Sequence, residues 1–112
     1  MELKIKKYCF DIKTAIESIN EFMININSVN DYQKSRLVKR AVEREIEIIG
    51  EAMNQLLKYD SNIQIENARK IINTRNWVIH GYDSVDDKII WDIIISHLPI
   101  LYSDVLKILD TN

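Results

Sequence analysis

The chain has 112 residues, of which 46% are hydrophobic and 29% charged, a balance typical of one folded domain rather than of a disordered chain. It contains two glycines and one proline, so an all-β domain, which needs a turn about every 8–12 residues, is strongly disfavoured. A net charge of −2 argues against a general nucleic-acid binder.

The single cysteine, Cys9, cannot form an internal disulfide, and two histidines cannot by themselves make a structural zinc site. No uninterrupted apolar run approaches the roughly 18 residues of a membrane span, and the first seven residues lack the apolar core of a signal peptide. We therefore expect one cytoplasmic domain over residues 1–112, with no metal and no cofactor.

The first predicted helix has apolar residues at alternating steps of four and three. This spacing places them on one face of a helix, near the 3.5-residue period of coiled-coil packing. Asparagine-rich residues 25–30 then interrupt the pattern. The predicted apolar seam is Ile5, Cys9, Ile12, Ile16, Ile19, Met23 and Ile26.

A second helix is predicted from about Tyr32 to Tyr59, with Asn30 or Asp31 as its N-cap. Gly50 lies inside this helix, where it costs about 1 kcal/mol relative to alanine, so we expect a close helix crossing there. The seam is broad enough to pack on two neighbours. It consists of Val38, Val42, Ile46, Ile49, Met53 and Leu56, widened by Ala41, Ile48 and Ala52.

A third helix is predicted over residues 65–79, followed by a stop at Gly81. Asp83 or Ser84 should cap a fourth helix, which Pro99 must kink or split because it removes a backbone donor and clashes one turn back. The sequence therefore predicts an all-α antiparallel bundle of four helices, or five if Pro99 breaks the last one. The fourth seam is Ile90, Ile94, Leu98, Leu101, Val105 and Ile108.

Positive charge is concentrated in the first part of the chain. Residues 1–44 carry nine Lys/Arg and six Asp/Glu, whereas residues 45–112 carry six and eleven. The densest part could follow the phosphates of a nucleic acid, although a solvated helix face is the more common role of such a run. It comprises Lys34, Arg36, Lys39, Arg40 and Arg44.

Arg75 interrupts the apolar face of the third predicted helix with a permanent charge. Because burying that charge unpaired is costly, it needs either an acidic partner or a phosphate-bearing ligand. His80 lies about 140° around the helix, so the two side chains can converge only if the helix ends at His80 or if two copies of the chain form a cleft. Alternatively, Arg75 pairs with a core carboxylate and His80 caps the helix C-terminus.

Residues 75–82, Arg-Asn-Trp-Val-Ile-His-Gly-Tyr, resemble the Arg-x4-His-x-Tyr signature of HepT-like proteins. These are minimal members of the HEPN superfamily and toxins of HepT/MntA toxin–antitoxin pairs. Residues 42–52 also resemble the second-helix pattern of that family, and residues 85–99 resemble its closing helix. The resemblance extends from the first helix to Leu109.

This resemblance implies an all-helical homodimer in which Arg75 and His80 of both copies line a cleft that cleaves RNA without a metal. Asn76 then corresponds to the polar residue that often follows the arginine. The implied partner is a minimal nucleotidyltransferase antitoxin, which silences the toxin by transferring AMP to Tyr82.

The chemistry of these residue types suits that role. The unperturbed pKa of histidine, about 6.5, allows proton transfer near neutral pH, and arginine offers a charged planar fork to phosphate oxygens. An AMP group on Tyr82 would bring negative charge and bulk to the cleft. Two other classes stay open: a non-catalytic module that binds a nucleotide or docks a nucleotidyltransferase, and a helical dimerisation domain with an ion-paired Arg75.

Three glutamates, Glu43, Glu47 and Glu51, lie on adjoining turns near Arg44. A surface ladder of ion pairs is the favoured interpretation, and the other is that Glu47 or Glu51 supports the site as the partner of Arg75. Four further tyrosines have no neighbours in the sequence that suggest chemistry. They are Tyr8, Tyr32, Tyr59 and Tyr102.

Overall fold

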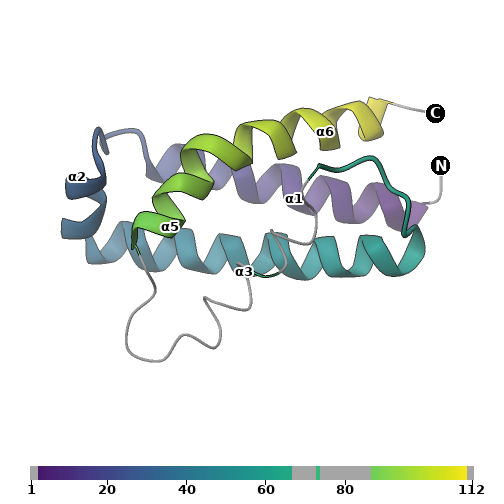
Figure 1. The fold of residues 1–112 in the computed structure, drawn as a ribbon, viewed down its shortest axis with the longest axis horizontal. Coiled ribbons are helices and arrows are strands. Elements are labelled where there is room, and N and C mark those ends of the chain that lie inside the picture. Colours follow the sequence, from purple (N-terminus) through teal and green to yellow (C-terminus); the bar gives the residue numbers. More distant parts are fainter. Residues whose placement is uncertain (1–2, 67–72, 74–86, 111–112) are drawn as a thin grey trace.

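The computed structural model describes residues 3–66, 73 and 87–110, and these residues form a helical bundle without strands (Figure 1). This confirms the predicted all-α class. Helix α1 runs antiparallel to both α3 and α6 and lies between them, and no close backbone contact joins α3 directly to α6. The elements are α1 (Leu3–Phe22), α2 (Val29–Lys34), α3 (Arg36–Tyr59), α5 (Asp87–Asp92), the π-helix η1 (Ile93–His97) and α6 (Leu98–Asp110).

The apolar seam of α1 forms the centre of the core. Its five members from Ile5 to Ile19 are buried, whereas Met23 and Ile26 are only partly buried. The helix ends at Phe22, before the last two predicted positions, because the chain enters a tight turn in which the Ile26 N–H donates to the Met23 carbonyl at 3.0 Å. Across the bundle, the Tyr102 hydroxyl of α6 donates to Glu17 of α1 at 2.7 Å.

The predicted start of the second helix, near Tyr32, is wrong. Two helices, α2 and α3, meet at Ser35 instead. The backbone of Ser35 is extended, and its hydroxyl accepts a hydrogen bond from the Val38 N–H at 3.2 Å, so α3 begins there. The shorter α2 is capped by Ser28, whose hydroxyl accepts from the Asp31 N–H at 3.1 Å. Asn30 and Asp31 therefore lie inside α2 rather than at its cap.

The predicted end of that helix and most of its seam are confirmed, whereas the close helix crossing at Gly50 stays a prediction. Helix α3 ends at Tyr59, and Gly50 is buried within it. The central seam residues Val42, Ile46, Ile49, Met53 and Leu56 are buried, as is Ala52, while Val38 and Ile48 are partly buried against the core.

The predicted disturbance of the helix at Pro99 takes the form of a π-helical turn and not of a split. Helix α6 begins at Leu98, and the Leu98 N–H donates to the carbonyl of Ile93, five residues back. The wider turn lies one turn before Pro99, where the proline ring would clash with an ordinary α-helical carbonyl. All six predicted seam residues from Ile90 to Ile108 are buried.

Taken as one stretch, Asp87–Asp110 is long and apolar enough, by length and composition alone, to cross a membrane. Core helices of soluble proteins pass the same test. In this bundle the seam of the stretch packs into the common core, and 33% of its most apolar window is buried.

Most of the predicted third helix lies outside the described residues. Of its positions the structure describes Asn73 and also Ile65 and Glu66, and the last two are not helical. The predicted stop at Gly81 and the predicted cap at Asp83 or Ser84 are likewise outside the described part of the chain.

Candidate functional site

Arg75, Asn76, His80 and Tyr82 all lie within residues 74–86, outside the described residues. The structure describes Glu66, nine positions before Arg75, and Asp87, which directly follows this segment in the chain. Their surroundings show which elements the signature connects.

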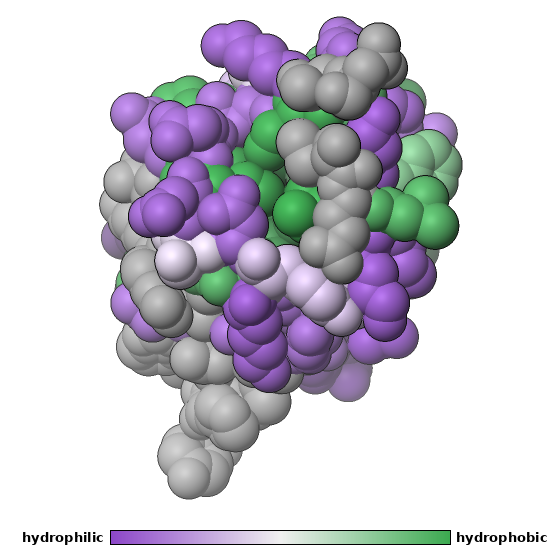
Figure 2. All heavy atoms as spheres, turned by 90° about the vertical axis from the view of Figure 1, so that its right-hand side faces the viewer, coloured by the Kyte–Doolittle hydropathy of each residue, from purple (hydrophilic) through white to green (hydrophobic). Residues whose placement is uncertain are grey.

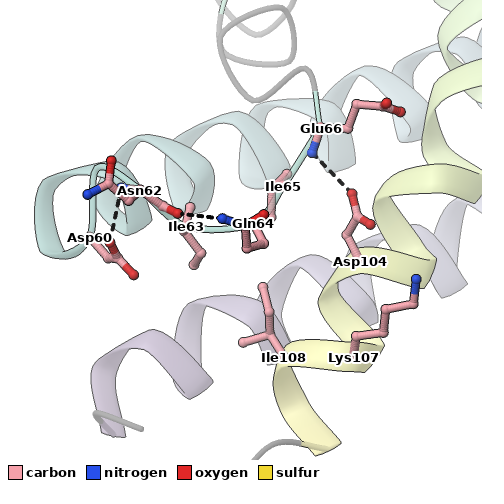
Figure 3. A pocket seen from close by; sticks show the side chains of 9 residues that line it. All are labelled: Asp60, Asn62, Ile63, Gln64, Ile65, Glu66, Asp104, Lys107 and Ile108. Atoms are coloured by element: carbon pink, nitrogen blue, oxygen red, sulfur yellow. Dashed lines mark hydrogen bonds between the residues drawn. The ribbon is translucent and has the colours of Figure 1, made fainter.

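Glu66 is held to α6 by its backbone. Its N–H donates to a carboxylate oxygen of Asp104 at 3.1 Å, although the two residues are 38 positions apart (Figure 3). A cavity of about 700 Å³ opens between this connection and α6. It is lined by Asp60, Asn62, Ile63, Gln64, Ile65, Glu66, Asp104, Lys107 and Ile108.

The charge of this cavity does not suit an RNA phosphate. Among the described lining residues, the carboxylates of Asp60, Glu66 and Asp104 outnumber the single cation, Lys107, and this part of the lining repels an anionic ligand. Figure 2 shows this end of the molecule, where purple, hydrophilic side chains surround green, apolar ones.

Asp87 is held to the start of α3 by an ion pair. The Lys39 ammonium lies 3.0 Å from one Asp87 oxygen, and both side chains are largely shielded from solvent, with exposed fractions of 29% and 15%. The first residue of α5 is thereby fixed against α3. Shielding makes this pair stronger than an exposed one, since solvent screens it less.

A buried tyrosine lies beside this ion pair. The Tyr32 side chain is fully buried, and its ring centroid is 6.3 Å from that of Trp91. Among the described residues neither its hydroxyl nor the second oxygen of Asp87 has a hydrogen-bond partner. Burial raises the pKa of the Tyr32 hydroxyl, and the carboxylates of Glu43 and Asp87 raise it further.

Glu43 is the second carboxyl, beside Asp87, at this junction of α2, α3 and α5. Its side chain is only 14% exposed. Burial raises the pKa of its carboxyl above the ordinary value, and the negative charges of Asp87 and Glu47 add to the rise, against the opposing influence of Arg40 and Lys39.

Glu47 and Glu51 lie along a groove of about 380 Å³ between α1 and α3. The Glu47 carboxylate is 3.6 Å from the Arg44 guanidinium, and Glu51 accepts a hydrogen bond from the Gln55 amide at 3.2 Å. These contacts fit the favoured surface ladder. Support of Arg75 by Glu47 or Glu51 stays a prediction, because Arg75 is not among the described residues.

The junction of Tyr32, Lys39, Glu43 and Asp87 was missed from the sequence. Tyr32 and Asp87 are 55 positions apart, and no local spacing connects them. The sequence offers one signal for this junction. Tyr32 lies just before the charged run that begins at Lys34, and this position is compatible with a buried hydroxyl near ionised groups. Within the described ranges, no group of three His, Cys, Asp or Glu side chains is placed to hold a metal ion.

Comparison with known proteins identifies the family of the chain. The model of the family described as ribonuclease HepT-like matches residues 12–108. The chain belongs to the HepT-like ribonuclease family. This match spans all the described helices except the start of α1 and the end of α6, and it includes the whole signature at residues 75–82.

Several named proteins are similar to this chain along most of its length. The HepT-like chain is 32% identical to a probable ribonuclease HepT of Thermococcus cleftensis, covering 90% of this chain and 92% of that protein. It is 27% identical to a candidate RNase of Methanocaldococcus jannaschii, covering 90% and 93%. A candidate RNase of Caldanaerobacter subterraneus subsp. tengcongensis is 35% identical, covering 73% and 74%. No solved structure matches the chain significantly.

Proposed function

We propose that this HepT-like chain is the toxin of a toxin–antitoxin pair, an endoribonuclease that acts as a homodimer of one HEPN-like domain over residues 1–112. Arg75 and His80 are its catalytic residues, and Asn76, Glu47 and Glu51 support them. A partner nucleotidyltransferase silences it by transferring AMP to Tyr82. It acts in the cytoplasm, where RNA and the ATP that supplies the AMP group are present.

One observation carries this proposal. The family match extends across residues 12–108, and the Arg-x4-His-x-Tyr signature within it is complete. The related proteins are named as ribonucleases. Arg75 and His80 are assigned as the catalytic pair because they occupy the arginine and histidine positions of the signature.

The proposed reaction requires no metal. A histidine takes the proton of the 2′-hydroxyl, the 2′-oxygen attacks the phosphorus, and the bond from phosphorus to the 5′-oxygen breaks, leaving a 2′,3′-cyclic phosphate. The departing 5′-oxygen receives a proton from a second histidine, which in the proposed dimer is His80 of the other copy. Arg75 stabilises the extra negative charge on the phosphate oxygens.

Cleavage of total RNA in the presence of a chelator tests this function. We expect the unaltered protein to cut RNA under these conditions and His80→Ala and Arg75→Ala to lose activity while keeping their helical content. Arg75→Lys should also be poor, because an ammonium does not reproduce the bidentate fork. Activity that disappears on chelation would refute the metal-independent reaction, and RNA binding without cleavage would support the non-catalytic module instead.

A further inference from the structure

Three arginines form an exposed ridge along α3. Arg36, Arg40 and Arg44 follow one another at steps of four residues, so they lie on one face of the helix with a rise of about 6 Å per step. All three are exposed, and the side chains of Arg40 and Arg44 are each 71% exposed. We call these three residues the arginine ridge.

The ridge is only weakly neutralised by its neighbours. Arg40 lies 3.9 Å from Glu43 and Arg44 lies 3.6 Å from Glu47, and such pairs three residues apart on a helix surface contribute little. Arg36 makes no ion pair with any residue that the structure describes. The glutamates are much less exposed than the arginines, so the guanidinium groups project beyond them into solvent.

The ridge also lies on the helix that holds Asp87, the residue that directly follows the signature segment in the chain. Lys39, between Arg36 and Arg40, is ion-paired with Asp87 at 3.0 Å, and Asp87 follows Tyr82 by five positions. Lys34, at the end of α2, is exposed and adds a further positive charge before the ridge. The exposed positive charges of Lys34 and the arginine ridge therefore lie on the two helices that meet near the Lys39–Asp87 ion pair.

We propose that the arginine ridge binds the phosphate backbone of single-stranded RNA and guides it to the signature residues. Guanidinium groups bind phosphate oxygens through paired N–H donors, and a row of positive charge that follows the backbone is the usual way to hold a single strand without reading its sequence. This inference rests on the proposed ribonuclease function, because it assigns the surface that binds the substrate.

The test measures binding of a fluorescein-labelled oligouridylate in which every 2′-hydroxyl is methylated, so that the proposed reaction cannot cleave it. The full chain is compared with the triple variant Arg36→Gln, Arg40→Gln, Arg44→Gln. A matched control removes three positive charges from the other end of the bundle: Lys4→Gln and Lys7→Gln in α1 and Lys58→Gln in α3.

We expect the ridge variant to bind at least tenfold more weakly than the control. The slope of log Kd against log salt should fall by about 2, since each phosphate contact to a single strand contributes roughly 0.7. With cleavable RNA, KM should rise much more than kcat falls. The triple Arg→Lys variant, which keeps the charge but loses the fork, should be intermediate, and it guards against misfolding of the glutamine variant.

Equal weakening in the ridge and control variants would overturn the inference, because it would reflect net charge alone. Unchanged RNA binding by the ridge variant would also overturn it and would be the result expected if the ridge docks a protein. Both results leave the ribonuclease function intact if the unaltered chain still cuts RNA. A chain that neither binds nor cuts RNA refutes the proposed function itself.

Discussion

At the scale of single residues, Glu43 is a carboxyl whose ionisation the fold opposes. A carboxyl whose pKa is higher in the folded than in the unfolded state stabilises the fold below its unfolded pKa, and this contribution is lost as the pH rises through the folded pKa. Because burial raises the pKa of Glu43, its ionised form carries a desolvation cost at neutral pH.

The variant Glu43→Gln should therefore have a higher free energy of unfolding than the unaltered chain at pH 7. The difference should shrink as the pH falls below about 4.3, where the glutamate is protonated in both states. Urea unfolding at several pH values measures it. The exposed Glu21→Gln in α1 is the control and should change stability by less than about 0.5 kcal/mol. A Glu43→Gln variant that is less stable at pH 7 would contradict the prediction.

Tyr82 is the residue on which the proposed regulation depends. Co-expression with a neighbouring nucleotidyltransferase, followed by intact-mass measurement and peptide mapping, should locate one AMP on Tyr82. The other four tyrosines provide an internal comparison, and two of them are poorly suited to modification, since Tyr32 is fully buried and the Tyr102 hydroxyl is bonded to Glu17. Tyr82→Phe should remain toxic beside an active partner. AMP found elsewhere, or none at all, would mean that the antitoxin acts by occlusion.

At the scale of helices, Ser35 has two functions in one position. It ends α2 through its backbone N–H, which donates to the Tyr32 carbonyl, and begins α3 through its hydroxyl. Ser35→Ala removes the acceptor of the Val38 N–H and should lower the free energy of unfolding by about 1 kcal/mol. Ser103→Ala, at an exposed position inside α6, should change it by less than about 0.5 kcal/mol. Equal effects of the two substitutions would exclude a capping role.

The sequence predicted the buried faces of the helices better than their ends. Each seam depends on periodic apolar residues, and periodicity survives local irregularities. The break at Ser35 was not predicted because a serine between two amphipathic stretches is compatible with one continuous helix as well as with two. By contrast, Pro99 was informative because its ring chemistry forbids an undisturbed helix.

The same contrast holds for the candidate site. The signature at residues 75–82 lies within eight consecutive positions, so it could be recognised from the sequence and assigned to a family. The pairing of Lys39 with Asp87 joins positions 48 apart. Such a pairing depends on how α3 and α5 pack, and no spacing in the chain encodes it.

At the scale of the whole molecule, the stretch from α5 to α6 carries three exposed apolar residues. Ile89 and Ile100 are each 41% exposed and Ile95 is 55% exposed. Such residues favour burial against another surface, and in the proposed homodimer that surface belongs to a second copy.

Light scattering at micromolar concentration should therefore give the mass of a dimer. The double variant Ile95→Asp, Ile100→Asp should shift the population toward monomer if this stretch forms the interface, whereas Leu37→Asp, which alters a residue of α3 that is 82% exposed, serves as the control. A monomer for the unaltered chain would contradict the dimer. A dimer unaffected by the double variant would place its interface elsewhere.

The central position of α1 has a consequence for how the protein is made. During translation α1 leaves the ribosome first and can pair with α3, yet the side that α6 covers stays open until α6 itself has emerged. From Tyr59 at the end of α3 to Asp110 at the end of α6, the ribosome adds about 50 residues, which takes roughly 3 to 10 s at ordinary rates of synthesis. Throughout that interval the nascent chain presents an incompletely covered apolar helix, which is the kind of surface that chaperones bind.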